Sequence, residues 1–131
     1  MGLPAAGKST FARTRFPDHD YISKDAFPPS ARNKQARQDA ALRTALAAGR
    51  SVVVDNTSVT PAERAAIIGI ARDYGARVVG YYLEVSTRVA VARNEGRTGR
   101  AKVPKVAIFT CAKRLVPPAR EEGFDELHTV A

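Results

Sequence analysis

The chain has 131 residues, of which 44% are hydrophobic and 26% charged, and this fits one folded domain with one core and excludes wholesale disorder. It has no apolar run near the ~20 residues that cross a bilayer and no signal peptide before its first motif, so we expect no membrane segment. The lone cysteine, Cys111, cannot form an internal disulfide and favours a reducing cytoplasm. The isolated histidines, His19 and His128, lack metal-ligand spacing, which argues against a zinc site.

The formal net charge of +8 arises from one segment, residues 86–120. This segment holds nine basic residues and one acid, Glu95, whereas the rest of the chain carries twelve basic and twelve acidic residues. Concentrated positive charge attracts polyanions, so the segment is a candidate surface for nucleotide phosphates or a nucleic-acid backbone. A solvated basic face without a ligand is the alternative interpretation. The nine are Arg88, Arg93, Arg97, Arg100, Lys102, Lys105, Lys113, Arg114 and Arg120.

The predicted elements alternate between helix and strand. Residues 8–16 form a helix that a proline stops, and residues 19–23 form a short strand. Ser30 is the expected N-cap of a helix over 30–48, which a glycine ends. Residues 51–55 ("SVVVD") are the clearest strand, because a continuous β-branched run suits burial on both faces of a sheet.

The second half of the chain continues this alternation. The sequence "TPAE" (60–63) places a cap, a proline and a glutamate where a helix begins. Strands are expected at 77–84 and 126–130, with helices between them from Thr87 and over 104–116. Strands separated by helices of this length predict an α/β fold with a parallel sheet covered on both faces. The helix after residue 60 is expected to bury Ile67, Ile68, Ala71 and Tyr74.

The opening residues, "MGLPAAGKST", match the phosphate-binding pattern G-x-x-x-x-G-K-[ST]. The glycines of such a loop let backbone N–H groups point at phosphate oxygens, and the following helix adds the positive end of its dipole. The lysine supplies a charge to the outer phosphates and the next hydroxyl binds Mg²⁺. A chance match in a glycine-rich turn is the alternative. The loop predicts ATP and Mg²⁺ binding by Gly2, Leu3, Pro4, Ala5, Ala6, Gly7, Lys8, Ser9 and Thr10.

Two carboxylates follow predicted strands. Asp25 comes just after the strand 19–23, and because the carboxyl ends of parallel strands line the ligand crevice, it can accept a proton from an attacking hydroxyl. A helix cap or a surface acid is the alternative for this residue. Asp55 ends a strand beside the loop, where it can organise Mg²⁺-bound water or hold a catalytic arginine. Asn56 and Thr57 are interpreted as turn formers.

A glycine- and arginine-rich stretch, "ARNEGRTGRAKVP", is predicted to form a lid over residues 93–103. Arg93 and Arg97 lie four residues apart, one helical turn, so both can face the same direction. Gly96 and Gly99 would let the segment open and close. Such a lid can bring two guanidinium groups onto a transferring phosphoryl group, whose spread negative charge they would stabilise.

Together these motifs resemble the polynucleotide 5′-hydroxyl kinase branch of the P-loop kinases. The stretches "GLPAAGKSTF", "SKD", "VVVDNT", "RNEGRTGRAKVP" and "PAREEGFDEL" fall in that family's order along nearly the whole chain. The resemblance implies one kinase domain over residues 1–131, with the three-layer P-loop NTPase sandwich and a short lid. It also implies transfer of the γ-phosphate of ATP to a 5′-hydroxyl end of DNA or RNA, as in nucleic-acid repair.

The same resemblance assigns roles to individual residues. It implies that Asp25 is the general base and that Lys8, Arg93 and Arg97 contact the phosphates. It implies that Ser9 coordinates Mg²⁺ and that Asp55 supports the metal through water.

The chain departs from the family's pattern near the base. The family usually has Asn-Arg before the base, whereas Ser23 and Lys24 stand here, and a member of the family has an arginine where this chain has Pro28. Arg32 or Lys34 could substitute as a contact for the acceptor's phosphate. These departures concern the acceptor site and leave the predicted reaction unchanged.

Two other functions fit the sequence. A small-molecule kinase of the same fold would keep the loop, the base and the lid, but would need a closed polar pocket for a sugar, nucleoside or antibiotic hydroxyl. A nucleotide- or nucleic-acid-binding module without turnover would keep the loop and the basic segment but would not need Asp25.

The strand that normally precedes a phosphate-binding loop is not found in the sequence. In kinases of this type that strand lies at the centre of the sheet, between the strands predicted here at 51–55 and 77–84. Its loss would leave neighbouring backbone groups unpaired, at ~1–3 kcal/mol for each buried group. We therefore expect that the chain lacks a strand of about six to ten residues before Gly2. Direct pairing of the neighbouring strands, or a strand donated by a partner chain, is the alternative.

Overall fold

The computed structural model describes residues 1–131, except for the side chain of Arg100. The helices are α1 (Lys8–Arg15), α2 (Lys34–Ala47), α3 (Pro61–Asp73), α4 (Thr87–Glu95) and α5 (Lys105–Arg114). The strands are β1 (Asp20–Ile22), β2 (Val52–Val54), β3 (Val79–Leu83) and β4 (Glu126–Val130), and the short 3₁₀ turns are η1 (Lys24–Ala26), η2 (Gly99–Ala101) and η3 (Arg120–Glu122). Every helix and strand expected from the sequence is present, so the α/β alternation is confirmed.

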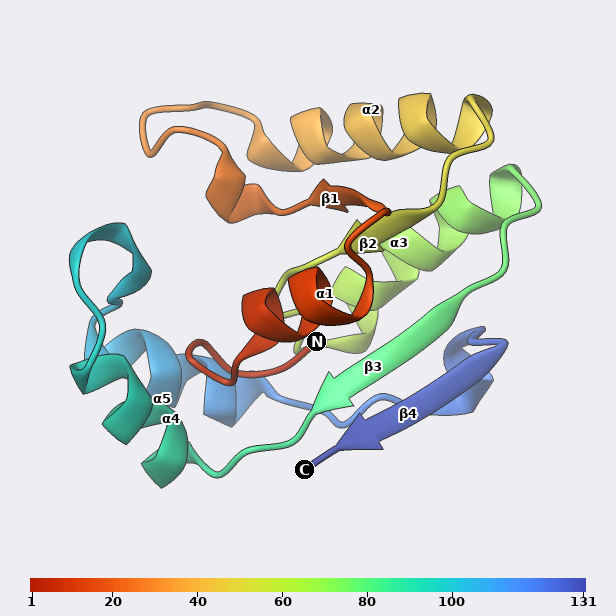
Figure 1. Ribbon diagram of the computed structural model, residues 1–131. Helices are drawn as coiled ribbons and strands as arrows, with labels where there is room; N and C mark the ends of the chain where they lie inside the picture. The colour runs from red at the N-terminus through yellow and green to blue at the C-terminus, as the bar shows by residue number, and fades with distance from the viewer.

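The strands form two parallel pairs. β1 pairs with β2, with Asp20 opposite Val52, and β3 pairs with β4, with Val79 opposite Glu126. Within the described part of the chain β2 and β3 do not pair, so the gap expected between these two strands is present and their direct pairing, the alternative, is not seen. Figure 1 shows the two pairs side by side, with the N-terminus between them.

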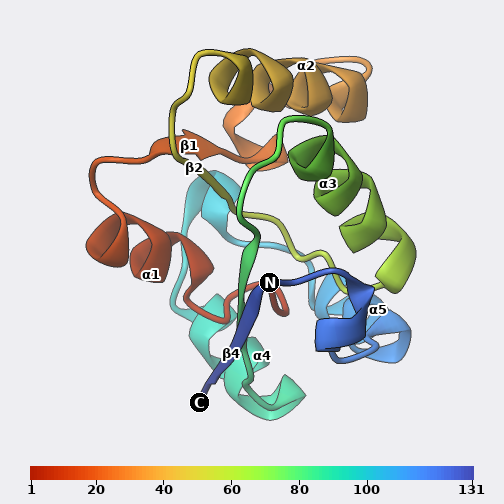
Figure 2. The same cartoon turned by 90° about the vertical axis from the view of Figure 1, so that its right-hand side faces the viewer.

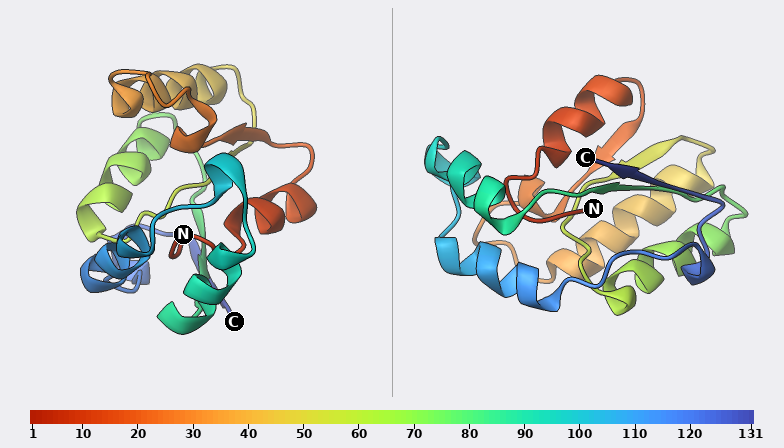
Figure 3. Two further views of the ribbon diagram at one scale, coloured as in Figure 1. Left: turned by 90° about the vertical axis from the view of Figure 1, so that its left-hand side faces the viewer. Right: turned by 90° about the horizontal axis from the view of Figure 1, so that it is seen from below.

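Helices cover both faces of these strands, as expected. α1 lies on one face, where Phe11 and Phe16 pack against Tyr81 of β3 with ring centroids 5.2 and 5.5 Å apart. α2 and α3 lie on the other face, where Leu42 and Ile70 form a buried cluster with Ile22 of β1. Figures 2 and 3 show this three-layer arrangement, with α1 on one side and α3 on the other. None of the helices in the described residues has the length and apolar character needed to span a bilayer.

Two local predictions are wrong. The N-cap of α2 is Asn33 rather than Ser30, because Asn33 has a left-handed backbone (φ 56°) that no helix can include. Tyr74 is 41% exposed rather than buried, because α3 ends at Asp73 and the chain turns away from the core. Ile70, one turn earlier, is buried in its place.

Candidate active site

The phosphate-binding loop lies between the carboxyl ends of β2 and β3. The Gly2 amide donates to the Thr57 carbonyl at 3.0 Å, and a Cβ on Gly2 would come within 2.7 Å of the Leu83 carbonyl oxygen. No side chain fits at that position, so glycine is required there. Gly7 has a left-handed backbone (φ 94°) at the N-cap of α1, which turns the chain into the helix. The loop thus contacts the segments that follow β2 and end β3, and it leads directly into the N-terminus of α1.

Lys8 is the point at which the predicted charged groups converge. Its Nζ donates to the Leu3 carbonyl at 2.8 Å, across the loop. Burial lowers the pKa of Lys8, and the positive charge of Arg97 lowers it further. The negative charges of Asp55 and Asp25 act in the opposite direction without outweighing burial. Three other residues predicted to act in catalysis or metal binding are therefore close enough to Lys8 to influence its charge.

Ser9 and Asp55, the predicted magnesium ligands, are in direct contact. The Ser9 hydroxyl donates to Asp55 Oδ2 at 2.9 Å, and the carboxylate is buried at the end of β2. A serine hydroxyl and a carboxylate are oxygen donors of the kind that Mg²⁺ prefers, and one or two such groups are enough beside nucleotide phosphates. The residues present therefore fit a Mg²⁺ ion.

Tyr21 joins this pair, although the sequence analysis did not single it out. Its hydroxyl donates to Asp55 Oδ2 and lies 3.3 Å from Ser9 Oγ. Burial raises the pKa of Tyr21, and the hydrogen bond to Asp55 raises it further. The strand register could have indicated this contact, because Tyr21 is paired with Val53, two residues before Asp55 on the neighbouring strand.

Asp25, the predicted base, lies on the exposed turn η1 at the end of β1. Its amide donates to the Ser23 hydroxyl at 3.3 Å. The preceding amide, of Lys24, donates to Asn56 Oδ1 at 3.1 Å, so the turn that carries the base is tied to the end of β2. Asn56 therefore does more than form a turn, which is the role that the sequence analysis gave it.

Gln38 holds the Asn56 side chain in place, and the sequence analysis did not identify this residue either. Asn56 Nδ2 donates to Gln38 Oε1 at 2.6 Å, and Gln38 is only 1% exposed. Gln38 shares the buried face of α2 with Leu42 and Ala45. A polar residue in register with an apolar helical face is the signal that could have found it.

The two arginines of the predicted lid line the same cavity, although α4 ends between them. Arg93 Nη1 donates to the Ala6 carbonyl of the loop at 3.2 Å, and Arg97 Nη1 donates to the Ala101 carbonyl at 3.1 Å. The cavity measures about 710 Å³. It is lined by Ala5, Ala6, Gly7, Thr10, Phe11, Thr14, Arg15, Leu83, Val85, Arg93, Arg97, Val130 and Ala131.

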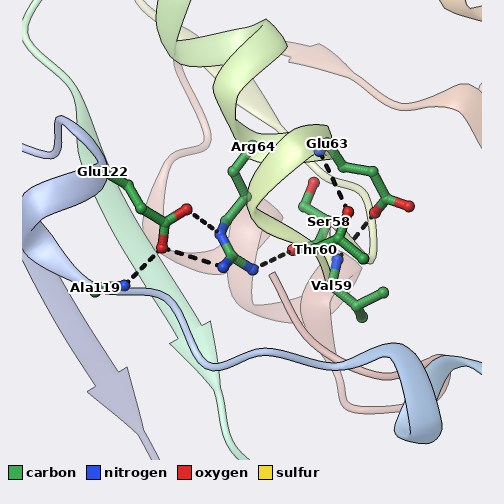
Figure 4. Close-up of polar contacts among 7 residues, drawn as sticks. All are labelled: Ser58, Val59, Thr60, Glu63, Arg64, Ala119 and Glu122. Atoms are coloured by element: carbon green, nitrogen blue, oxygen red, sulfur yellow. Dashed lines mark hydrogen bonds and ion pairs between the residues drawn. The ribbon is translucent and has the colours of Figure 1, made fainter.

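A buried ion pair holds the segment that follows Asp55. Arg64 is 2% exposed, and its guanidinium donates to both carboxylate oxygens of Glu122, at 2.7 and 3.1 Å, and to the Ser58 carbonyl at 3.0 Å. The Ala119 amide donates to the same carboxylate at 2.7 Å. Figure 4 shows how this pair links α3, the Ser58 turn and the segment before η3.

The capping pattern expected at residue 60 is confirmed. Thr60 Oγ1 accepts from the Glu63 amide at 3.3 Å, and the Glu63 carboxylate accepts from the Val59 amide at 3.0 Å. Glu63 also pairs with Arg114 of the basic segment at 2.6 Å.

Part of the positive charge of residues 86–120 is balanced locally. Lys105 lies 3.1 Å from Glu95, and Arg114 pairs with Glu63 from outside the segment. The segment spans α4, η2 and α5, which pack together around Ala90 and Ile108 beside the loop residue Leu3. The helices that carry the basic residues thus pack beside the loop, and Arg93 and Arg97 line the cavity next to it.

Comparison with known proteins identifies relatives over nearly the whole chain. The sequence profile of the AAA_33 family, described as an AAA domain, matches residues 1–118. A bifunctional polynucleotide phosphatase/kinase of Schizosaccharomyces pombe is 27% identical over 135 residues, and the match covers 99% of this chain. The chain spans only about a third of that relative, 32% of its length.

Solved structures share the fold. A gluconokinase from Sinorhizobium meliloti 1021 matches with a TM-score of 0.69 and 23% identity, over 100% of this chain and 80% of that one. Kti12 of Chaetomium thermophilum, solved in complex with ADP-AlF3, has a TM-score of 0.75 and 18% identity, and the match covers 100% of this chain and 86% of that one. A fungal RNA kinase has a TM-score of 0.70 and 18% identity, and the match covers 98% of this chain and 36% of that one. These likenesses confirm the P-loop NTPase fold. The family match and the polynucleotide phosphatase/kinase relative agree with the resemblance read from the motifs.

Proposed function

Because the chain belongs to the AAA_33 family of AAA domains, we propose that it transfers the γ-phosphate of ATP to a hydroxyl group, with the 5′-hydroxyl end of DNA or RNA as acceptor. One observation carries the proposal: the Lys24 amide ties the η1 turn that carries Asp25 to Asn56 after β2, and the adjacent Asp55 accepts from Ser9 of the phosphate-binding loop, so a candidate base and the loop share one site. The whole chain, residues 1–131, is then one kinase domain whose lid is residues 93–103.

The proposed reaction is an in-line attack of the acceptor hydroxyl on the γ-phosphate. Asp25, an exposed residue on η1, takes the proton of the attacking hydroxyl. Lys8 leaves the Leu3 carbonyl to contact the outer phosphates, and Arg93 and Arg97 close on the phosphoryl oxygens.

Mg²⁺, when bound at Ser9, would neutralise charge on the β- and γ-phosphates. Asp55 already accepts a hydrogen bond from the Ser9 hydroxyl, so it is placed to orient that hydroxyl and the water of the ion. The Tyr21 hydroxyl donates to the same carboxylate oxygen, Asp55 Oδ2.

The nucleoside part of ATP fits the cavity of about 710 Å³ beside the loop. That volume lies in the usual range for small-molecule sites. Phe11 and Val130 offer apolar surface to a base, and Thr10, Thr14 and Arg15 offer polar groups. The phosphates would then follow the loop toward Lys8.

Two features favour a nucleic-acid acceptor. The curated relative is a polynucleotide phosphatase/kinase, and the basic segment adjoins the site. A small alcohol is the second candidate, since a gluconokinase has the same fold. A nucleotide- or nucleic-acid-binding module without turnover is the third.

The test is to offer radiolabelled ATP and Mg²⁺ with a 5′-hydroxyl oligonucleotide of DNA, the same of RNA, and a panel of small alcohols that includes gluconate. The matched control for each oligonucleotide is its 5′-phosphorylated form. Label transfer to the 5′-hydroxyl strands alone supports the proposal. Transfer to a small alcohol, or ATP binding without transfer to any acceptor, would replace it with the second or third candidate.

A further inference from the structure

Tyr21 connects the two segments that carry the predicted magnesium ligands. Its hydroxyl donates to Asp55 Oδ2, just after β2, and lies 3.3 Å from Ser9 Oγ in the first turn of α1. The Ser9 hydroxyl donates to the same carboxylate oxygen at 2.9 Å. Side chains from α1, from β1 and from the end of β2 therefore meet at one oxygen atom.

Asp55 is tied to β1 at two points. Its amide donates to the Ile22 carbonyl at 2.8 Å, which continues the pairing of β1 with β2. Its carboxylate accepts from Tyr21, the residue before Ile22. The backbone bond fixes where the Asp55 side chain starts, but that side chain can still rotate about its own bonds. The hydroxyl of Tyr21 is the group of β1 that opposes this rotation.

The ring of Tyr21 is held separately from its hydroxyl. The guanidinium carbon of Arg13 lies over the ring, 5.1 Å from its centroid. Arg13 comes four residues after Ser9 on α1, so both residues lie on the side of the helix that faces Tyr21. Because Arg13 contacts the ring, this contact does not need the hydroxyl. The hydroxyl can therefore be removed without releasing the ring from the helix.

We propose that Tyr21 is a positioning residue for the magnesium site, and that its hydroxyl holds the Asp55 carboxylate in one orientation beside Ser9 before Mg²⁺ and ATP bind. A serine hydroxyl has one proton and two lone pairs, so Ser9 can keep its bond to Asp55 while a lone pair serves the ion. Removal of a group that orients a metal-binding side chain typically lowers metal affinity about 10- to 100-fold. This inference rests on the proposed function, because Ser9 and Asp55 serve Mg²⁺ and ATP in it.

The test measures the affinity for ATP in the presence of Mg²⁺ and, separately, in EDTA. Tyr21→Phe removes the hydroxyl and keeps the ring beside Arg13. We expect this variant to bind ATP about 10-fold more weakly in Mg²⁺, because the carboxylate loses its support. In EDTA its affinity for ATP should change less than about 2-fold, since the phosphate-binding loop is untouched. Tyr74→Phe is the matched control: it removes a hydroxyl at the end of α3, beside Arg43, and should change neither affinity.

A double-mutant cycle shows whether Tyr21 acts through Asp55. The cycle combines Tyr21→Phe with Asp55→Ala, which leaves no carboxylate for the hydroxyl to hold. In the Asp55→Ala background we expect Tyr21→Phe to lower the affinity for ATP in Mg²⁺ by less than about 2-fold, because residues that act as one unit have non-additive effects. A loss as large in this background as in the parent chain would overturn the inference.

The remaining outcomes separate this inference from the proposed function. Equal affinities of Tyr21→Phe and the parent chain for ATP in Mg²⁺ would overturn the positioning role. A loss of equal size in Mg²⁺ and in EDTA would also overturn it, because a hydrogen bond that only supports the fold does not distinguish the two conditions. A parent chain whose ATP affinity ignores Mg²⁺ would overturn both proposals. Mg²⁺-dependent ATP binding that is sensitive to Tyr21→Phe, without phosphoryl transfer to any acceptor, would support the positioning role and overturn the proposed function alone.

Discussion

The side-chain oxygen of Asn56 accepts the backbone amide of Lys24 at 3.1 Å, and this hydrogen bond joins the end of β2 to the turn that carries Asp25. Gln38, buried in α2, fixes the orientation of the Asn56 amide through a second bond of 2.6 Å. The position of the proposed base is therefore set by two uncharged residues that do not touch the reacting groups.

Replacing Asn56 with leucine should disorder the η1 turn and lower kcat with the oligonucleotide acceptor by about 10-fold, because the base loses its support. The dissociation constant for ATP should change less than 2-fold, since the loop and the lid are untouched. Steady-state kinetics and equilibrium ATP binding measure the two effects, and amide exchange at Lys24 reports the lost bond directly.

The control for this change is Asn56→Asp, which keeps an acceptor for the Lys24 amide and lets Gln38 rotate its amide to donate. We expect it to restore protection of the Lys24 amide. Equal exchange at Lys24 in the leucine and aspartate variants would contradict a positioning role for Asn56.

The change Asp25→Asn should cut turnover by ~10²-fold or more, because an amide cannot take the proton of the attacking hydroxyl. ATP affinity should stay nearly intact, since Asp25 is not part of the phosphate loop. Single-turnover transfer and equilibrium ATP binding separate these effects. Near-normal turnover in this variant would remove Asp25 from the role of base.

Neutralising Lys102 and Lys105 together should weaken oligonucleotide binding more than ATP binding if the basic segment holds the acceptor strand. The slope of log affinity against log salt should become shallower by about 1.4, for two lost contacts to a single strand. Binding titrations over a range of salt concentrations measure this slope. Lys105 also pairs with Glu95, so its own share is expected to be the smaller of the two.

The matched control is Arg43→Gln with Arg77→Gln, which removes two charges from exposed pairs outside the basic segment. It should change the slope little. Equal losses for oligonucleotide and ATP in the lysine variant, or a salt response as flat as that of a neutral ligand, would favour a small acceptor.

The helices, strands and loop could be predicted because their signals are local. The cap at Thr60, the β-branched run before Asp55 and the glycine pattern of the loop each act over a few neighbouring residues. The prediction of Ser30 as the N-cap of α2 was wrong, because the left-handed backbone of Asn33 makes the helix begin after Asn33. The prediction of Tyr74 as a core residue was wrong, because the hydrophobic periodicity of α3 does not show that the helix ends just before Tyr74.

The contacts that complete the site have weaker signals in the sequence, because they join distant elements. Tyr21 reaches Asp55 across paired strands, and Gln38 reaches Asn56 from a helix. Such contacts depend on strand register and helix rotation, which no short motif encodes. One long-range feature was indicated by the sequence: a gap was expected between the strands at 51–55 and 77–84, and β2 and β3 do not pair.

The buried pair of Arg64 and Glu122 should dominate the stability of the region behind the site. Glu122→Gln leaves the guanidinium, which is 2% exposed, without its anion, and loss of such a partner costs about 3 kcal/mol or more. For a chain of this size that lowers Tm by roughly 10 °C. Thermal unfolding at pH 7 measures the change, and Glu121→Gln, an exposed neighbour on the same turn, is the control that should leave Tm nearly unchanged.

The same pair predicts how stability depends on pH. Desolvation alone would raise the pKa of Glu122, but the hydrogen bonds from Arg64 and Ala119 and the charge of Arg64 outweigh it, and the pKa lies below its usual 4.5. A carboxyl group whose pKa is lower in the folded state stabilises the fold above its unfolded pKa, and that contribution is lost as pH falls through the folded pKa. The free energy of unfolding should therefore drop below about pH 4.5 more steeply in the parent chain than in Glu122→Gln. If denaturant titrations gave both chains the same acid slope, the Arg64–Glu122 pair would not be the group that titrates there.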